Sequence, residues 1–592
     1  MGKDLQEPEI VHGYRRLKKG KLECLYSHGE IRQLCFAGTQ VLNAVYSAVR
    51  DHNWATIPFS VRDETIRDSN DSCLIQLIQD FREGDIRYQA HVTISISERE
   101  LTYTFRGTSK NRFKKNRIGI CILHPVRECS GKKVEITHPD GSITSAEFPE
   151  YISPRQPFRD IREMRWSPLP EMNARLEFQG ELFESEDQRN WSDASYKTYA
   201  PPLALPYPAG IEIGDQIHQS LTLGLDVHSR WIRTSETGRK LFYILPGAHA
   251  SLPKIGTSRT TEDQPLTPAE TAKLHKLGLS HIRTDLHLGS PGWKQVYAEE
   301  YQQFERLGKA IQLALYFTDH IEDQLRSFMD LYSTHPLPLS EVLLFDGRLL
   351  SSPELLNKTV PRFRKYLPDI PLGGGTDANF AELNRNPPER DLLDFITYSI
   401  CPQVHATDAM TMVENVLAQG DTVESARALS SRPVHIGAVS LRQRFNAVAT
   451  EKVHRSRPQT DPRQHSQLAA GWTLSSIREL ALGGAESVTY YETAGPRGIL
   501  DRDREAGTDS PLFMLFEQIL SDPGFRVVPT RSSHPLEFDG LLLEGETGRK
   551  LLMTNYAGVK KEIEIQGLHG TKGIFEIRPG INAYTIQDEI LS

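Results

Sequence analysis

Cysteine is scarce in this sequence. Six cysteines occur in 592 residues, and none of them forms a Cys-x-x-Cys pair. Sparse, unpatterned cysteine argues against a disulfide framework and against a zinc site, so we expect a reducing compartment and no metal cofactor. The first eight residues also lack the apolar core of a secretory signal. The sequence therefore predicts a cytoplasmic protein.

Long hydrophobic runs and an excess of positive charge are missing as well. No stretch has the length and apolarity of a membrane span, which argues against a membrane protein. The formal net charge is −8 and no basic stripe is interleaved with aromatic residues, so nucleic acid is not expected as a main partner. Small neutral or weakly charged molecules remain as ligands, and nothing in the sequence indicates an oligomeric state.

The length predicts several domains, and the first of them has the pattern of an all-β domain. Residues 86–96 alternate polar and apolar side chains with period two, and residues 101–105 follow as a second strand. His138-Pro139-Asp140-Gly141 is a tight-turn signal. We predict an N-terminal antiparallel β-sandwich over residues 1–228.

The chain then changes to a strand–helix rhythm, which we assign to residues 229–524. Thr267 and Pro268 suit the cap and first turn of a helix that ends near Gly278. The predicted strands are residues 241–245, 281–288, 310–317, 341–347, 370–377, 395–403, 433–440 and 487–493. Eight such units match a TIM (β/α)8 barrel. The rival, a doubly wound open sheet, is disfavoured because no glycine-rich phosphate fingerprint follows the first strand.

Two further segments complete the predicted layout. Residues 442–467 are polar, rich in Arg and His, and lack apolar periodicity. We expect them to form an extended loop after the seventh strand, on the face where barrel sites form. Alternating runs at residues 540–544 and 549–555 predict a small C-terminal β-domain over residues 525–592.

The stretch from Phe183 to Tyr199 is dense in carboxylates, amides, cations and aromatic residues. It could be a solvated acidic loop, as charge runs often are. A flat indole face beside bidentate hydrogen-bonding groups also suits a sugar, and the stretch lies just before the barrel. We therefore expect it to roof a sugar pocket. Its candidate substrate-binding residues are Glu186, Asp187, Arg189, Asn190, Trp191 and Lys197.

Each barrel strand should turn its apolar residues toward the helices and the alternate set inward. The inward set and the strand ends supply the remaining candidates: Arg283, Asp285, His287, Asp346, Gln403, His405, Tyr491 and Glu492. Arg283 and Asp285 could instead form an internal ion pair, and Asp285 with His287 is a weak metal-ligand pattern. His405 could cap the helix that begins near Asp408.

Two carboxylates across a barrel mouth are the pattern of glycoside hydrolysis, and the same groups would serve a sugar lactone. Lactone opening needs a base to activate water, a donor for the oxyanion and an acid for the departing ring oxygen. Asp285 or Glu492 could be the base and His405 the acid or donor. The candidate oxyanion supports are Arg189, Arg283 and Lys197. The Asn-Glu pair that many glycosidase barrels carry after the fourth strand is missing from residues 344–348.

Seven segments resemble the D-apionate lactonase family. They are residues 46–51, 116–119, 157–162, 186–191, 381–385, 402–406 and 489–493. The resemblance implies an N-terminal β-domain, a TIM barrel and a small C-terminal domain. It also implies hydrolysis of D-apionolactone to D-apionate. Residues 405–408 lack the aromatic residue that the family pattern has after His-Ala, which indicates a changed pocket contact.

These observations predict a cytoplasmic sugar-lactone hydrolase without a metal cofactor. Its predicted catalytic residues are Glu492, His405 and Asp285. A glycoside hydrolase that acts on a small or plant-derived glycoside is the first alternative. A carbohydrate-binding protein without catalytic activity is the second.

Overall fold

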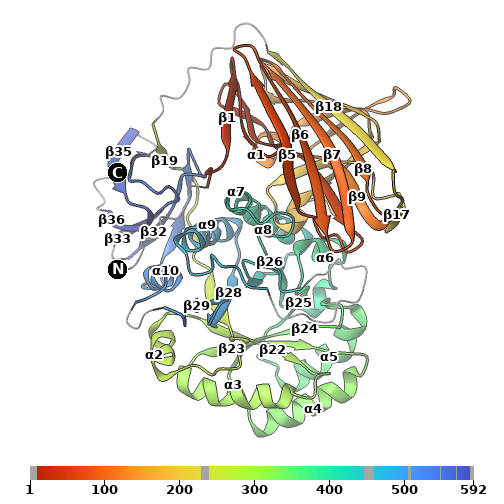
Figure 1. Ribbon diagram of the computed structural model, residues 1–592. Helices are drawn as coiled ribbons and strands as arrows, with labels where there is room; N and C mark the ends of the chain where they lie inside the picture. The colour runs from red at the N-terminus through yellow and green to blue at the C-terminus, as the bar shows by residue number, and fades with distance from the viewer. Residues whose placement is uncertain are drawn as a thin grey trace.

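The computed structural model describes residues 10–227, 239–445, 459–504, 508–546, 548–567 and 570–586. Two stretches on which expectations were built, residues 1–8 and 446–458 of the polar loop, lie outside the described residues. Figure 1 shows the β-rich N-terminal part above the barrel, with the C-terminal strands beside it.

Two nine-stranded antiparallel sheets form the N-terminal part. In spatial order the first sheet holds β1 (Arg15–Lys19), β2 (Leu22–Ser27), β3 (Glu30–Phe36), β4 (Thr39–Asp51), β9 (Phe113–Pro125), β16 (Ser195–Tyr199), β15 (Phe183–Asp187) and β12 (Phe158–Ile161), with β17 (Ala209–Ile211) beside β9. The second holds β11 (Ile143–Glu147), β10 (Lys133–Thr137), β13 (Glu163–Leu169), β14 (Met172–Gln179), β18 (Gln216–Val227), β8 (Glu100–Ser109), β7 (Ile86–Ser97), β6 (Ser72–Glu83) and β5 (Phe59–Asp68). Every second residue of β7 is buried between the sheets, which confirms the predicted sandwich.

Eight parallel strands form the barrel, which closes where the first pairs with the last. They are β21 (Lys254–Ser258), β22 (His281–His287), β23 (Ala310–Tyr316), β24 (Leu339–Phe345), β25 (Leu372–Gly375), β26 (Phe395–Ile400), β27 (Val434–Val439) and β28 (Ser487–Ala494), with β29 (Gly498–Leu500) beside β28. The TIM barrel predicted from the sequence is confirmed.

Helices alternate with the barrel strands and cover their outer face (Figure 1). They are α2 (Pro268–Lys276), α3 (Trp293–Leu307), α4 (Ile321–Thr334), α5 (Pro353–Tyr366), α6 (Phe380–Arg385), α7 (Ala409–Glu414), α8 (Leu417–Leu429), α9 (Gln467–Gly483) and α10 (Pro511–Ile519). Thr267 caps α2 in a complete capping box, as its sequence indicated. Asp408 caps α7 by accepting from the Thr411 amide at 2.8 Å, so the cap is Asp408 and not His405.

The predicted first barrel strand was wrong. Residues Leu241–Ile244 form β19, which pairs with β31 (Thr530–Ser532) and β34 (Lys561–Gly567) in a C-terminal sheet. The buried ring of Phe242 belongs to the apolar core of that part. The barrel begins instead at β21, where Gly256 packs against the His281 ring. Three short extended segments, β19, β20 (Ala250–Ser251) and β21, lie shortly before α2, and local periodicity cannot show which sheet each will join.

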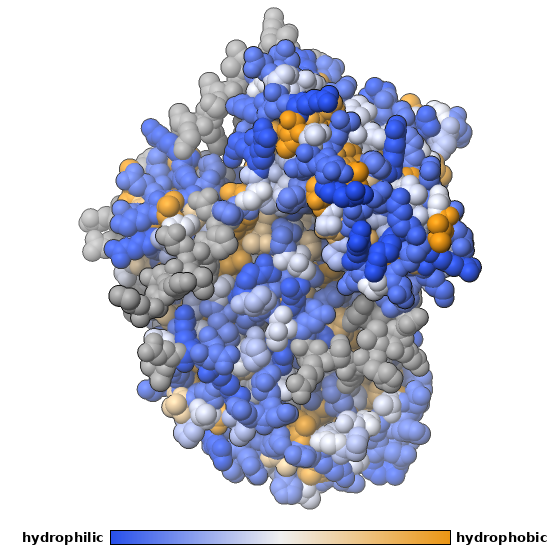
Figure 2. Space-filling view, in the orientation of Figure 1, coloured by the Kyte–Doolittle hydropathy of each residue, from blue (hydrophilic) through white to orange (hydrophobic). Residues whose placement is uncertain are grey.

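Two small sheets make up the C-terminal part. The first contains β31, β19, β34 and β35 (Gly570–Ile577), and the second contains β20 (Ala250–Ser251), β30 (Arg526–Val528), β32 (Phe538–Gly545), β33 (Gly548–Asn555) and β36 (Gly580–Ile586). The face seen in Figure 2 is mostly hydrophilic, with small separate apolar patches. Among the described residues, no helix is long and apolar enough to cross a membrane.

Candidate active site

A cavity of about 2000 Å³ lies between the first sheet of the sandwich and the carboxyl ends of the barrel strands. Ten of the residues singled out from the sequence line it: Glu186, Trp191, Lys197, Arg283, Asp285, His287, Gln403, His405, Tyr491 and Glu492. Asp187, Arg189, Asn190 and Asp346 are not among its lining residues. Barrel enzymes place their sites at this face of the barrel.

The stretch from Phe183 to Tyr199 is buried, so it is not a solvated loop. Its two strands, β15 and β16, pair with each other, and β16 also pairs with β9. Alternation along β15 sends Ser185 into the sandwich, where its hydroxyl bonds that of Thr198 at 2.7 Å. Glu186 takes the other face and meets the Lys197 ammonium at 3.2 Å at the cavity wall.

The turn η1 (Gln188–Trp191) joins the two strands and docks them onto the barrel. The Arg189 guanidinium, 1% exposed, binds both carboxylate oxygens of Asp187 at 2.8 and 2.9 Å and reaches Asp421 of α8 at 3.0 Å. Burial alone would lower the pKa of Arg189, but Asp187 raises it above its ordinary value. Asn190 accepts from Asn384 of α6 at 3.0 Å. These side chains hold the two parts together behind the cavity wall.

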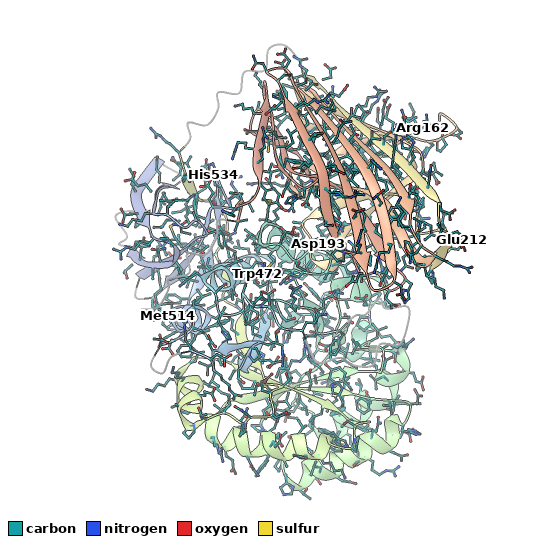
Figure 3. The ribbon with its side chains drawn as sticks, in the orientation of Figure 1. Arg162, Asp193, Glu212, Trp472, Met514 and His534 are labelled. Carbon is teal, nitrogen blue, oxygen red and sulfur yellow. The ribbon has the colours of Figure 1, made fainter. Side chains whose placement is uncertain are left out.

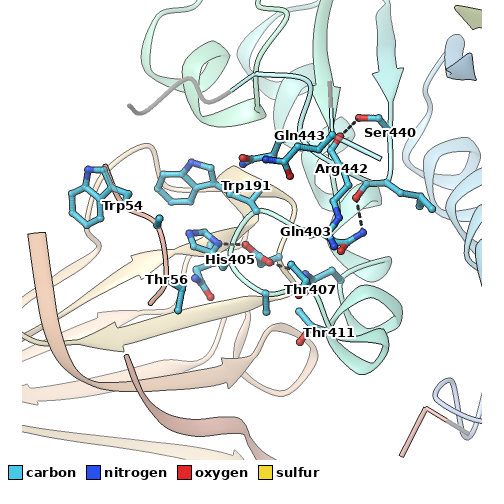
Figure 4. A pocket seen from close by; sticks show the side chains of 18 of the residues that line it. Trp54, Thr56, Trp191, Gln403, His405, Thr407, Thr411, Ser440, Arg442 and Gln443 are labelled. Carbon is cyan, nitrogen blue, oxygen red and sulfur yellow. Dashed lines mark hydrogen bonds and ion pairs between the residues drawn. The ribbon is translucent and has the colours of Figure 1, made fainter. Parts of the chain in front are cut away.

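His405 lies beside Trp191, with ring centroids 5.5 Å apart and planes at 82°. Its Nδ1 meets an Asp193 oxygen at 2.5 Å, and the other Asp193 oxygen accepts from the Asn415 side-chain amide at 2.7 Å. The opposite edge of the imidazole, with Nε2, faces the cavity that His405 lines (Figure 4). Asp193 lies at the joint between the first sheet and the barrel (Figure 3). A carboxylate on Nδ1 orients the ring and leaves Nε2 as a base.

Sequence reasoning did not single out Asp193. It belongs to the polar stretch that drew attention, but its partner lies 212 positions away. The only usable signal was the requirement that a catalytic histidine have an orienting acceptor. No such acceptor can be placed without knowing that η1 meets the loop after β26.

A buried charged cluster forms the floor of the cavity. Arg283 binds Asp285 at 2.8 Å, Asp377 at 2.8 Å and the Tyr316 hydroxyl at 2.9 Å. Arg444 also binds both carboxylates, at 2.8 Å for Asp377. The internal ion pair left open by the sequence is therefore present, and Asp377, Tyr316 and Arg444 are the partners that the sequence did not reveal.

The cluster sets the protonation of its members. Burial would raise the pKa of Asp285, but the Arg283 and Arg444 guanidiniums hold it well below its usual range. Burial and the two carboxylates raise the pKa of Tyr316, so its hydroxyl stays protonated and donates to Asp377. An anion stabilised in this way is a weak base, so Asp285 is better suited to binding than to activating water.

Glu492 is also held firmly. One oxygen accepts from Arg497 Nε at 2.8 Å and the Thr261 hydroxyl at 2.9 Å, and the other accepts from the Thr261 amide at 3.0 Å. Tyr491 precedes it with a φ of 53°, an uncommon conformation for a large residue. Tyr491 donates to or accepts from Thr473 of α9 at 2.7 Å, so its ring turns to the helix while Glu492 turns to the mouth.

The loop after β27 reaches the cavity through residues 442–445. Gln403 links to it, because its amide donates to Asp461 at 2.8 Å and accepts from Arg463 at 2.9 Å. Burial would raise the pKa of Asp461, but its hydrogen bonds to Arg463 and Gln403 lower it to about 2.

Two further candidates from the sequence lie on other strands of the barrel. Asp346 orders the turn after β24 by accepting from the Arg348 backbone amide at 2.8 Å. His287 stacks near Tyr316, with ring centroids 4.2 Å apart.

Comparison with known proteins decides the family. A model of the D-apionate lactonase N-terminal domain matches residues 3–228, and a model of the D-apionate lactonase TIM barrel domain matches residues 255–524. The chain belongs to the D-apionate lactonase family. It is similar to a D-apionate lactonase of Brucella anthropi, with 27% identity over 90% of this chain and 93% of that protein. Membership of this family makes the chain a hydrolase.

Solved structures match the chain only at low identity and low TM-score. An α-L-arabinofuranosidase from Thermotoga maritima matches with a TM-score of 0.42 and 9% identity over 59% of this chain and 97% of its own. A GH30 endoxylanase from Clostridium papyrosolvens matches with a TM-score of 0.38 and 10% identity over 60% and 98%. A putative aldose 1-epimerase from Escherichia coli matches with a TM-score of 0.25 and 12% identity over 36% and 99%.

Within the described ranges, no three or more His, Cys, Asp or Glu side chains are grouped so that they could hold a metal ion. Asp285, which the sequence offered with His287 as a weak ligand pair, has its two oxygens bound to Arg283 and Arg444.

Proposed function

We propose that the protein hydrolyses a sugar lactone, D-apionolactone or a close aldonolactone, in the cavity at the barrel mouth. The observation that carries this proposal is the His405–Asp193 pair beside Trp191. A histidine with one nitrogen oriented by a carboxylate and the other open to a cavity suits proton transfer. An indole next to it suits a sugar ring, whose apolar face packs on the flat face of an aromatic ring. The family and its relative in Brucella anthropi support the lactone.

In this proposal His405 serves first as base and then as acid. Nε2 takes a proton from water, and the water oxygen attacks the lactone carbonyl. The tetrahedral oxyanion then collapses, the bond to the ring oxygen breaks, and the imidazolium returns its proton to that oxygen. Asp193 stabilises the imidazolium between the two steps. The single product is an aldonic acid, because the departing ring oxygen stays attached to the sugar chain.

The oxyanion needs a donor at the cavity wall. Of the supports proposed from the sequence, Arg189 is buried behind η1 and Arg283 is bound to two carboxylates, which leaves Lys197. The Gln443 side chain is a second candidate, because it borders the same part of the cavity as Trp191 and His405 (Figure 4). Glu492 and Asp285 are proposed to bind sugar hydroxyls.

The glycoside hydrolase alternative is less well supported. Both of its candidate carboxylates are already held by donors, Asp285 by Arg283 and Arg444 and Glu492 by Arg497 and Thr261, so neither is free for attack on a sugar carbon. A glycosidase needs one carboxylic acid that can give up a proton and one carboxylate free to attack or to activate water.

A direct assay separates the two reactions. Base uptake at constant pH should accompany addition of D-apionolactone and other aldonolactones to the wild type, and His405→Gln should lose it. Release of phenol from aryl glycosides should stay at the background rate. Aryl-glycoside turnover without lactone hydrolysis would contradict the proposal.

A further inference from the structure

The cavity is larger than the proposed substrate requires. Sites for drug-sized ligands usually have roughly 300–1000 Å³, and a five-carbon lactone is smaller than such ligands. The cavity here has about 2000 Å³ and continues from the barrel mouth onto the open face of the first sheet. A ligand larger than one lactone ring would therefore contact the residues of that sheet.

The sheet surface at this end is a shallow well. Its floor consists of small residues, Ala48 on β4 and Gly119 and Cys121 on β9, and Ala48 is paired with Gly119 in the ladder. The small side chains of Ala48 and Cys121 leave space that bulky residues would otherwise fill, whereas a side chain at Gly119 would meet Gln219 of the second sheet. Ala48 and Cys121 pack against Tyr199, which closes one side of the floor.

Polar groups surround this floor. Lys197 and Glu186 have side chains only 10% and 11% exposed, and both line the cavity. Their 3.2 Å contact uses one of the three ammonium donors and one carboxylate oxygen. The ammonium also lies 5.2 Å from the Tyr199 ring centre. One of its two other donors is proposed for the oxyanion of the reacting ring, and the last donor and the remaining Glu186 lone pairs can meet a second ring. Tyr46 and Arg50 of β4 also line the cavity, on the same face of the sheet as Ala48.

Trp54 forms the outer wall of the well. It lines the cavity in the turn after β4 with a φ of 69°, a left-handed conformation that is unfavourable for a tryptophan. Its neighbours hold it in place: the Tyr207 ring meets it edge-on at 5.2 Å, and the Arg117 guanidinium lies 5.8 Å from its ring centre. Figure 4 shows Trp54 and Trp191 bordering the same cavity, with His405 on the side of Trp191.

We propose that this well is a second sugar subsite and that the enzyme accepts lactones that carry a second sugar ring. An indole wall, a floor of small residues and a buried ammonium–carboxylate pair are the groups that a pyranose or furanose ring requires. The reacting lactone lies at His405 and the second ring lies against Trp54. This inference depends on the proposed lactonase activity and specifies its substrate class.

The test compares two substrates with the same reacting ring, arabinono-1,4-lactone and its 5-O-arabinosyl derivative. The wild type should hydrolyse the second with a kcat/KM at least about tenfold higher, the scale of one good aromatic contact. Trp54→Ala should remove this advantage and leave the plain lactone unchanged within about twofold. Trp54→Phe, which keeps a flat ring, should retain most of it. Tyr151→Ala truncates an exposed aromatic residue of the same domain outside the cavity and should behave as the wild type.

Trp54→Gly covers the case in which alanine is poorly tolerated, because glycine adopts positive φ without strain. It too should lose only the advantage of the second ring. Equal kcat/KM for both lactones in the wild type, or an equal fall for both in the Trp54 variants, would overturn the second subsite and leave the proposed function intact. Failure on both arabinonolactones with turnover of D-apionolactone would overturn the subsite alone, and failure on D-apionolactone as well would overturn the proposed function with it.

Discussion

The Asp193→Asn variant tests the proposed base most directly. In the wild type both Asp193 oxygens accept, one from His405 Nδ1 and one from the Asn415 amide. Asparagine has one acceptor and one donor end. Its oxygen will keep the bond from Asn415, which can only donate there because the Asn415 oxygen is bound to the Ala194 amide. The NH2 group of the new asparagine then faces Nδ1 of His405, so Nδ1 must accept a hydrogen bond. The ring proton therefore moves to Nε2, which can no longer act as a base.

The size of the effect follows from two contributions. Returning the ring to the active tautomer breaks a buried hydrogen bond, at about 1–2 kcal/mol. The imidazolium also loses its carboxylate, and two unit charges about 4 Å apart at an effective dielectric constant of about 20 attract by about 4 kcal/mol. The sum of about 5–6 kcal/mol predicts a fall in kcat of roughly 10⁴-fold.

The assay is lactone-dependent base uptake, with kcat and KM measured separately. KM should change little, because Asp193 is proposed to position His405 and not to bind the sugar. Asp369→Asn, an exposed change in the loop before β25, is the matched control and should have wild-type kinetics. The melting temperature should show that both variants are folded. A kcat for Asp193→Asn within tenfold of the wild type would refute the role of His405 as base.

Four other outcomes are expected. Glu492→Gln should lower kcat/KM by about tenfold to a hundredfold, because it removes the carboxylate that Arg497 holds at the cavity mouth and that is proposed to bind sugar hydroxyls, and a fall within threefold would remove Glu492 from the site. Arg189→Met should lower the free energy of unfolding in urea by about 3–5 kcal/mol, because Asp187 becomes a buried charge without a partner. Prolonged dialysis against EDTA should leave lactone turnover unchanged, and recovery by an added divalent metal would contradict the expected metal independence. Asp461→Asn should destabilise by about 1–2 kcal/mol above pH 4, where the wild-type carboxylate, with its pKa lowered to about 2, is ionised and paired. Because a lowered folded-state pKa stabilises only above the unfolded value, that difference should shrink as the pH falls from 4 toward 2 in urea titrations.

Sequence periodicity was sufficient for the architecture and for the direction of most barrel side chains. On β22, Thr284 turns outward to Glu300 of α3 at 2.8 Å, while Arg283 turns inward to Asp377. This follows from the period of two within a strand. Periodicity failed where the partner of a strand mattered: β19 and β21 are both short extended segments before α2, and they belong to different parts of the protein.

The candidate site was harder to predict because its contacts are long-range. Asp285, His405 and Glu492 could be placed at strand ends from local pattern alone. Asp193 and Arg444 could not, because their roles depend on which loops meet over the barrel. Within the polar stretch, composition could not separate residues that line the cavity from residues that join the domains. Glu186 and Trp191 line the cavity, whereas Arg189 binds Asp421 of the barrel. Only the alternation of β15 and the turn of η1 separate these two groups.

The polar character of this joint has a mechanical consequence. An apolar contact between sandwich and barrel would bury area without fixing a register, because the hydrophobic effect is not directional. Here Leu25 of β2 meets Met410 and Val413 of α7 in an apolar cluster, but directional bonds are also made. They run from Arg189 to Asp421, from Asn384 to Asn190 and from the Ala194 amide to Asn415. Buried polar pairs contribute little net stability but can specify one arrangement. The arrangement they specify brings the acceptor on the sandwich within hydrogen-bonding distance of the imidazole on the barrel. The proposed base therefore exists only when the two domains are docked, which explains why so polar a segment is buried between them.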